Sequence, residues 1–187
     1  NTGSGWLTAE YGMLPTSTGS RNKREAKQGK QTGRTIEIQR LIGRSLRTII
    51  DLKKIESGQF IIDCDVIQAD GGTRTASITG SFVALVLAVK KLLKNGCLKK
   101  NPIKDNLAAI SCGIVKKNIM VDLDYSEDSI AQVDANFVFS ENSGISEIQI
   151  SGENFTFNRK SMDEMLDQSF ESVKKIFDLQ KKIIGDL

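Results

Sequence analysis

The chain has 187 residues, a formal net charge of +3 and no histidine. This length suits one domain with a real hydrophobic core, and the lack of histidine excludes a histidine general base, a Ser-His-Asp triad and a histidine-ligated zinc site. The three cysteines, Cys64, Cys97 and Cys112, are widely spaced, so we expect reduced, buried thiols in a cytoplasmic protein. No segment reads as a membrane span or as a signal peptide.

The N-terminal part begins with a short predicted strand, residues 6–11, followed by a polar loop, residues 16–33. The loop shows no hydrophobic periodicity and is long for a loop inside a compact domain. It sets five basic residues against one acid: Arg21, Lys23, Arg24, Lys27, Lys30 and Glu25. Such a loop is either an arm for a polyanion or a solvated surface loop, and the sequence leaves both open.

A helix is predicted from residue 33 to about residue 54, because apolar residues recur there at helical spacing. Its apolar face consists of Ile38, Leu41, Ile42, Ser45, Leu46, Ile49 and Leu52. A break at residues 57–58 precedes an alternating segment, residues 60–68, which we predict to be a strand.

The stretch QADGGTRTA, residues 68–76, connects this strand to a long apolar helix that ends near residue 95. The first turn of a helix has backbone N–H groups without internal partners and a partial positive charge. Glycines let an anion approach that backbone, and Arg74 adds a two-pronged donor, so we predict an oxyanion site, most simply for phosphate. The alternative is that the glycines only form a turn and that Thr73 or Thr75 only caps the helix.

The two predicted helices begin in a similar way. QTGRT, residues 31–35, resembles DGGTRT, residues 70–75, and each segment carries an arginine, Arg34 or Arg74, at the first turn. Two such helix starts that converge would hold a phosphate better than either one alone, and we state this convergence as a hypothesis.

The C-terminal half alternates between strand signals and turn signals and ends in a helix. The predicted elements are strand 107–115, a hairpin turn at 116–118, strand 119–124, strand 133–139, a turn at 141–144, strand 145–150, and a helix from a capping box at Ser161–Glu164 to about Ile184. Its expected buried stripe is Met165, Leu166, Ser169, Val173, Ile176, Phe177 and Ile183. Strands gathered against a few helices indicate an α+β domain, or an α/β domain with a mixed sheet.

Five acids and no base lie between residues 122 and 134. The alternation of strand 119–124 places Asp122 and Asp124 on one face. Clustered carboxylates repel one another, so they tend to meet a cation or to raise one another's pKa, and ligands that offer only oxygen suit magnesium or manganese. The alternative is a solvated acidic rim.

Several long blocks resemble the ribonuclease PH family. They are GWLTAEYGMLP at 5–15, GRTIEIQRLIGR at 33–44, DCDVIQADGGTRTASITG at 63–80, and DYSED at 124–128 followed by DAN at 134–136. The resemblance runs from Gly5 into the last helix. It implies a ribosomal protein S5 domain 2-like fold, with a mixed sheet packed against helices.

The resemblance also implies a phosphorolytic 3′→5′ exoribonuclease, a tRNA nucleotidyltransferase that trims precursor tRNA and other RNA 3′ ends. Inorganic phosphate would be the co-substrate, and Mg²⁺ or Mn²⁺ the expected ion. The expected assembly is a homo-hexamer, a trimer of dimers, with no membrane or DNA partner. The matching positions are Arg34, Gly72, Thr73 and Arg74 for phosphate, Asp128 and Asp134 for catalysis and metal, and Arg21 and Arg24 for RNA.

The chain departs from the family pattern at two places. Thr16 stands where the family usually has an arginine, which predicts weaker RNA binding. The family also has a block of strands before the residue that matches Gly5, so we expect a single domain over residues 1–187 that is N-terminally truncated relative to the family. The alternatives to an active enzyme are a catalytically inactive RNA-binding ring subunit and a truncated remnant.

Overall fold

The computed structural model describes residues 3–185 and 187, and it shows a mixed α+β architecture. In chain order the elements are β1 (Trp6–Met13), α1 (Glu25–Gln28), α2 (Gly33–Thr48), the 3₁₀ helix η1 (Leu52–Ile55), β2 (Gln59–Val66), α3 (Thr73–Lys94), β3 (Leu107–Val115), β4 (Asn118–Val121), α4 (Tyr125–Asp128), β5 (Val133–Ser140), β6 (Gly144–Gly152) and α5 (Arg159–Ile184).

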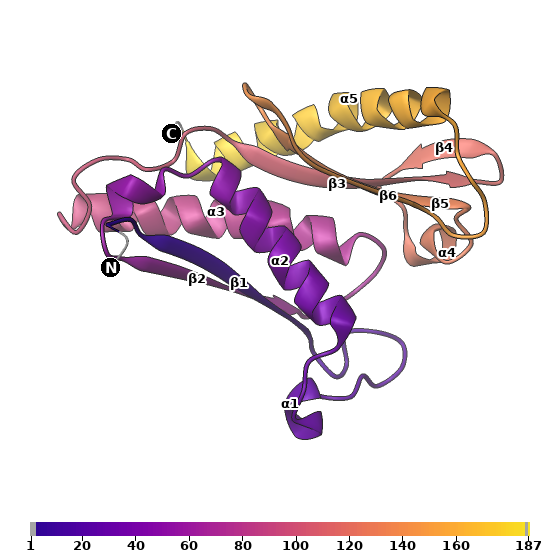
Figure 1. Cartoon of the computed structure of the whole chain (residues 1–187), viewed down its shortest axis with the longest axis horizontal. Coiled ribbons are helices and arrows are strands. Elements are labelled where there is room, and N and C mark those ends of the chain that lie inside the picture. The colour runs from indigo at the N-terminus through magenta and orange to yellow at the C-terminus, as the bar shows by residue number, and fades with distance from the viewer. Residues whose placement is uncertain (1–2, 186) are drawn as a thin grey trace.

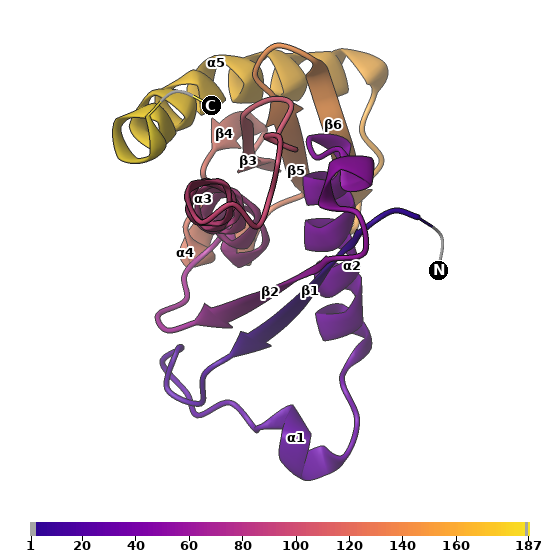
Figure 2. The ribbon, with the colours of Figure 1, turned by 90° about the vertical axis from the view of Figure 1, so that its left-hand side faces the viewer.

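The elements stack in four layers (Figures 1 and 2). Helix α5 covers one face of the sheet formed by β3 to β6, and helices α2 and α3 lie against its other face. The strands β1 and β2 cover the far side of α2 and α3. Helices α2 and α3 therefore lie between two sheets, and their N-terminal ends open onto the loops at the same end of the molecule.

The two sheets differ in strand direction. The strands β1 and β2 pair in parallel, with Leu7 opposite Phe60. The larger sheet is antiparallel and has the order β4-β3-β5-β6. The predicted hairpin between β3 and β4 is confirmed, because Lys116 and Lys117 both adopt positive φ angles, 51° and 70°, as a tight two-residue turn requires.

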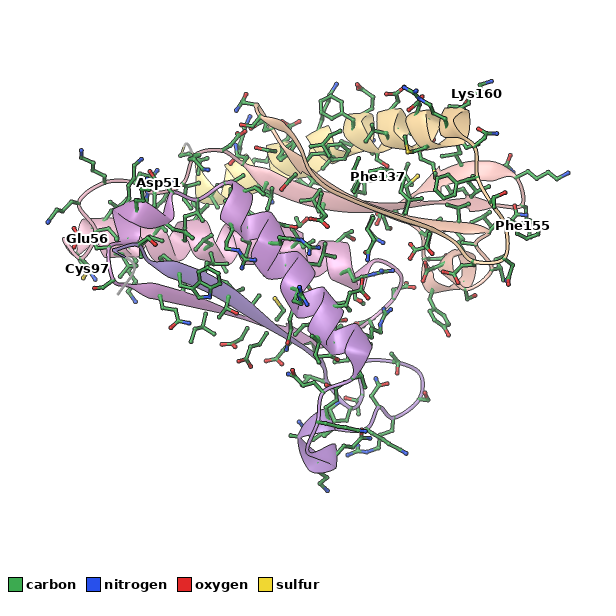
Figure 3. All side chains as sticks on the ribbon, viewed as in Figure 1. Asp51, Glu56, Cys97, Phe137, Phe155 and Lys160 are labelled. Carbon is green, nitrogen blue, oxygen red and sulfur yellow. The ribbon has the colours of Figure 1, made fainter. Side chains whose placement is uncertain are left out.

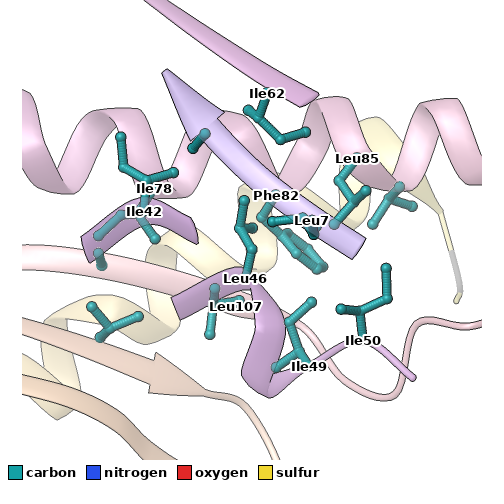
Figure 4. Close-up of a cluster of buried hydrophobic side chains, with 14 of the residues drawn as sticks. Leu7, Ile42, Leu46, Ile49, Ile50, Ile62, Ile78, Phe82, Leu85 and Leu107 are labelled. Carbon is teal, nitrogen blue, oxygen red and sulfur yellow. The ribbon is translucent and has the colours of Figure 1, made fainter. Parts of the chain in front are cut away.

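Two hydrophobic clusters hold the layers together. The larger one fills the space between the two sheets and includes Leu7, Ile42 and Phe82, whose side chains point toward one another (Figure 4). The smaller one lies between the antiparallel sheet and α5 and includes Phe137 (Figure 3) and Val173. Each cluster buries one face of the helices, which fixes where their N-terminal ends lie.

The helix predicted over residues 33–54 is shorter in the structure. It ends at Thr48, and Ile50 then forms an isolated bridge with Ile103. Asp51 N–H donates to the Pro102 carbonyl at 2.8 Å, which draws the chain away from the helix axis. The apolar periodicity continues only because residues 52–55 form a separate 3₁₀ helix. The predicted end of this helix was therefore wrong.

The start of the last helix also differs from the prediction. Helix α5 begins after Asn158, whose side chain accepts from Ser161 N–H at 2.9 Å, so the expected capping box at Ser161 is wrong. The buried stripe ends at Ile184, whereas Ile183 is 65% exposed. A capping box does occur earlier, between Asp124 and Glu127 at the start of α4.

Smaller corrections concern strand 119–124, the basic loop and the cysteines. The strand β4 ends at Val121, and Asp122 has a φ of 62°, so Asp122 and Asp124 do not share a strand face. The loop 16–33 contains the single-turn helix α1. Cys97 is exposed (Figure 3) and Cys64 is half-buried, so of the three thiols only Cys112 is buried as expected.

Helix α3 is long and apolar enough to cross a membrane by length and composition, contrary to the expectation that no segment is. In the structure this helix is packed between the two sheets, and Ile78, Phe82 and Leu85 are fully buried. Helix α3 is therefore a core helix of the fold.

Candidate functional site

The N-terminus of α3 is built on a left-handed glycine. Gly72 has a φ of +70° and occupies the cap position without a side chain to cap the helix. The two threonines have other partners: Thr73 Oγ1 accepts from the Tyr11 hydroxyl, and Thr75 Oγ1 donates to the Gly72 carbonyl, each at 2.9 Å. The interpretation that a threonine caps this helix is therefore wrong, and the first N–H groups of α3 carry no side-chain cap.

Gly71 brings this helix start against the loop that precedes α4. A Cβ atom on Gly71 would stand 2.0 Å from the Leu123 carbonyl oxygen, so only glycine allows this approach. The Asp70 carboxylate accepts from Gly71 N–H at 2.9 Å and from Tyr125 N–H at 2.6 Å. These contacts place the helix that carries Arg74 beside the helix that carries Asp128.

The guanidinium of Arg74 is held at two points. Its Nη2 donates to Asp134 Oδ2 at 2.6 Å, and its Nη1 donates to Gln149 Oε1 at 3.2 Å. The Arg74 and Asp134 side chains are only 16% and 18% exposed, so water screens this ion pair little. Asn136 Nδ2 lies 3.3 Å from the other oxygen of Asp134 and completes the support of that carboxylate.

A cavity of about 500 Å³ gathers six of the residues that the resemblance singled out. They are Arg34 from the start of α2, Gly72, Thr73 and Arg74 from the start of α3, Asp128 from the end of α4, and Asp134 from the start of β5. The two helix starts that carry arginine therefore open onto one space. This is the geometry that the convergence hypothesis requires, and the functional roles of the six residues stay predictions.

The electrostatics of the two carboxylates follow from this arrangement. Burial raises the pKa of Asp128, and the neighbouring charge of Asp134 raises it further, while Arg74 and Arg34 act in the opposite direction. The net effect is a pKa for Asp128 above its ordinary value. Asp128 therefore retains its proton to higher pH than an ordinary aspartate.

The acidic run does not form one cluster. Asp124 caps α4, and its carboxylate accepts hydrogen bonds from Glu127 N–H and the Ser126 hydroxyl. Within residues 3–185 and 187, no group of three or more acidic, histidine or cysteine side chains is placed to hold a metal ion. Of the acidic run, Asp128 and Asp134 line the cavity, together with Asp70, whose carboxylate accepts from Gly71 and Tyr125 N–H. The two carboxylates of Asp128 and Asp134 fit Mg²⁺ when phosphate oxygens and waters supply its other ligands.

Arg21 and Arg24 do not line the 500 Å³ cavity. They lie on the basic loop, where both line a separate hollow, and Arg24 also lines a larger hollow of about 730 Å³ that reaches Arg34. The loop is attached to α2 through Glu25, which accepts from the hydroxyls of Thr32 and Thr35, each at 2.8 Å. The structure therefore places these two arginines outside the 500 Å³ cavity, on the loop that also contributes Asn22 to it.

Sequence reasoning missed three polar residues at the site: Ser111, Asn136 and Gln149. Ser111 and Asn136 are opposite each other on β3 and β5, are 4% and 2% exposed, and line the cavity. The Ser111 hydroxyl has no hydrogen-bond partner in the described part of the chain, and it lies 3.3 Å from where a Cβ on Gly72 would stand. A serine and an asparagine inside otherwise apolar strands were the signals that could have identified them.

Comparisons with known proteins place the chain as a whole in a family. The 3′ exoribonuclease family models for domain 1 and domain 2 match residues 1–91 and 105–172. The chain is 55% identical to the ribonuclease PH of Cereibacter sphaeroides strain KD131 over 185 residues, and 53% identical to that of Caulobacter vibrioides strain NA1000. Each match covers 99% of this chain and 78% of the relative.

Two solved structures share the fold. The crystal structure of rice (Oryza sativa) Rrp46 superposes with a TM-score of 0.78 at 16% identity, covering 100% of this chain and 76% of that chain. The Archaeoglobus fulgidus exosome with RNA bound to its active site gives a TM-score of 0.73 at 20% identity, covering 94% and 71%. At these identities the likeness concerns the fold alone.

Proposed function

The chain belongs to the ribonuclease PH family of 3′ exoribonucleases, and from this premise we propose that its 500 Å³ cavity is the phosphorolytic centre. The protein is a phosphate-dependent exoribonuclease that trims tRNA 3′ ends. The observation that carries the assignment is the convergence of Arg34 and Arg74 on a cavity that also contains Asp128 and Asp134. Because all four residues are retained, we find no support for the alternatives of an inactive RNA-binding subunit or a truncated remnant.

Arg34, Arg74 and the uncapped start of α3 hold the attacking phosphate. Phosphoryl transfer depends on positioning and charge neutralisation more than on a protein nucleophile, so a site without histidine is sufficient. A guanidinium fork matches two phosphate oxygens, and the N–H groups of the first helical turn add further donors. Because the cavity is only partly open to water, these groups also stabilise the charge that develops in the transition state.

In the reaction, an oxygen of inorganic phosphate attacks the phosphorus of the terminal phosphodiester. The bond from that phosphorus to the 3′ oxygen of the preceding ribose breaks. The leaving 3′ oxygen takes up a proton, and the last nucleotide departs as a nucleoside diphosphate. We assign the donation of that proton to Asp128, because burial and the charge of Asp134 favour its protonated form. Asp134, paired with Arg74 at 2.6 Å, orients the arginine.

In their ionised forms, Asp128 and Asp134 would hold a divalent ion, and this metal-assisted route is the alternative to proton donation by Asp128. Mg²⁺ and Mn²⁺ bind through one or two carboxylates together with phosphate oxygens, which fits Asp128 and Asp134 beside an anion site. When bound, such an ion would neutralise charge on the reacting phosphates.

RNA enters past the basic loop, and Arg21 and Arg24 contact its phosphates there. We also propose that the chain assembles as a homo-hexamer and works in the cytoplasm. Large apolar side chains on the outer strands support assembly, since Ile61 of β2 and Ile145 and Ile148 of β6 are 56%, 49% and 45% exposed. The solution mass by light scattering tests the hexamer, and a monomer at micromolar concentration would contradict it.

The enzymatic assignment is tested with a tRNA that carries extra 3′ nucleotides. We expect nucleoside diphosphates to appear only when inorganic phosphate is present. Release of nucleoside monophosphates at the same rate without phosphate would show hydrolysis and would overturn the assignment.

A further inference from the structure

A row of polar contacts joins α2 to the edge strand β6. The Arg44 guanidinium donates twice to Glu147, at 3.0 and 2.7 Å, and the hydroxyls of Thr48 and Ser146 lie 2.7 Å apart. At the end nearest the cavity, Gln149 Nε2 donates to the Glu37 carboxylate. We call these three pairs the α2–β6 row. It links the helix that carries Arg34 to the strand that contacts Arg74.

The cavity end of this row has a fixed hydrogen-bond direction. The Gln149 amide has one donor side and one acceptor side, whereas the Glu37 carboxylate only accepts and the Arg74 guanidinium only donates. The amide must therefore turn its nitrogen to Glu37 and its oxygen to Arg74, as the structure shows. Glu37 thus determines which face of Gln149 meets the guanidinium.

The chain Glu37–Gln149–Arg74 also connects the two arginines. Glu37 lies one helical turn after Arg34 on α2, and Gln149 reaches Arg74 on α3. A guanidinium has five N–H donors. With one N–H given to Gln149 and one to Asp134, three remain for an anion, and their direction is set by the two contacts.

We infer that Glu37 and Gln149 are positioning residues for phosphate, which align the Arg74 fork with Arg34. The inference rests on the proposed function, because it concerns the phosphate of phosphorolysis. Neither residue lines the cavity, so both act through Arg74. Loss of the correct amide orientation would leave Arg74 held only by Asp134 and free to turn away from the phosphate.

The test reverses the hydrogen-bond direction and then restores it. In Glu37→Gln the new amide can either accept or donate, so the Gln149 nitrogen is no longer fixed toward position 37 and can turn toward Arg74, where two donors face each other. In Gln149→Glu two carboxylates face each other across the row. The double variant carries Glu37→Gln and Gln149→Glu and restores a donor opposite an acceptor at both contacts, with the net charge of the parent.

We expect each single variant to raise the KM for phosphate by roughly tenfold, as the loss of a hydrogen bond to a charged group does. The KM for tRNA and the unfolding temperature should stay near the parent values, and the double variant should recover most of the phosphate affinity. The matched control is Glu147→Gln, which breaks the same row at Arg44, where the side chains are 52% and 22% exposed, away from the cavity. Its phosphate KM should equal that of the parent.

Equal phosphate KM values in the parent and both single variants would overturn the inference, as would a double variant no better than either single one. A rise in phosphate KM in Glu147→Gln as well would show that the row acts only through general stability. These outcomes differ from a failure of the proposed function, in which the parent itself would release no nucleoside diphosphate.

Discussion

Arg74 Nη2 lies 2.6 Å from Asp134 Oδ2, although the two residues are 60 positions apart in the chain. This ion pair joins the anion site at the start of α3 to the carboxylate pair at the end of the antiparallel sheet. Because both side chains are largely shielded from water, the pair fixes the position of the proposed phosphate-binding arginine relative to the proposed proton donor, Asp128.

Removal of Arg74 should abolish phosphorolysis while the fold remains. We expect Arg74→Ala to lower kcat/KM for phosphate by about 100-fold or more, as loss of a preorganised charge-stabilising donor does. Arg74→Lys keeps the charge but loses the fork, so it should recover only part of the activity. Steady-state kinetics with phosphate as the varied substrate and circular dichroism of each variant check this prediction. Activity in Arg74→Ala equal to that of the parent would show that Arg74 has been assigned wrongly.

The pH dependence of phosphorolysis should report Asp128. A raised pKa keeps this carboxyl protonated to higher pH than an ordinary aspartate, and the rate should fall as pH rises through that pKa. The exposed Glu153 carboxylate contributes to the rise in the pKa of Asp128, so Glu153→Gln should move the falling limb to lower pH. Glu56→Gln, at the opposite end of the molecule, is the control and should not move it (Figure 3). A limb that stays in place in Glu153→Gln would contradict proton donation by Asp128.

Gly71 should tolerate no side chain. In Gly71→Ala the new Cβ would meet the Leu123 carbonyl oxygen, so the loop must shift and carry Arg74 away from Asp128. We expect a large loss of activity together with a lower unfolding temperature. The control is Gly80→Ala in the middle of α3, where nothing lies within 4 Å, and it should raise stability by about 0.5–1 kcal/mol. An active Gly71→Ala variant with parent stability would refute the close approach.

Asp105 should stabilise the turn between β5 and β6 through its charge. Burial opposes ionisation, but hydrogen bonds from Ser140, Asn142 and Ser143 outweigh it and hold the pKa of Asp105 below its ordinary value of 3.8. The stabilisation is therefore present above this value and is lost as pH falls through the lower pKa of the folded state. Asp105→Asn should lower the free energy of unfolding at pH 7 by about 1–3 kcal/mol.

Urea unfolding at several pH values checks the Asp105 prediction. The difference between the parent and Asp105→Asn should shrink below pH 3.8, where the parent carboxylate becomes protonated. Asp163→Asn breaks an exposed pair with Arg159, 3.7 Å apart, and should change stability by no more than about 0.5 kcal/mol. A difference for Asp105→Asn that is constant from pH 2 to pH 7 would argue against a charge effect.

The sequence allowed most elements to be predicted, because hydrophobic periodicity and turn residues are local signals. Strand 107–115 is an example, and its bounds agree with β3. Boundaries failed where a distant contact decides them, as at Ile50, which leaves the helix to pair with Ile103. The capping box failed at Ser161 because Asn158, three residues earlier, is already a suitable cap.

The site was predictable only in part for the same reason. The resemblance to the ribonuclease PH family singled out Arg34, Arg74, Asp128 and Asp134, but no local pattern shows that they share a cavity. The supporting residues were missed entirely. Gln149 lies in a strand whose alternation of apolar and polar residues gives no sign of a functional site. Only the packing of β6 against α2 brings it to Arg74.

We propose that Arg34 and Arg74 bind the same phosphate, and a double-mutant cycle tests this shared role. The cycle measures kcat/KM for phosphate in the parent, in Arg34→Ala, in Arg74→Ala and in the double variant, with tRNA at saturation. We expect strongly non-additive losses, in which the double variant is little worse than either single one, because either loss already breaks the two-arginine clamp. Losses that simply add would show that the two arginines act at separate places and do not share one phosphate.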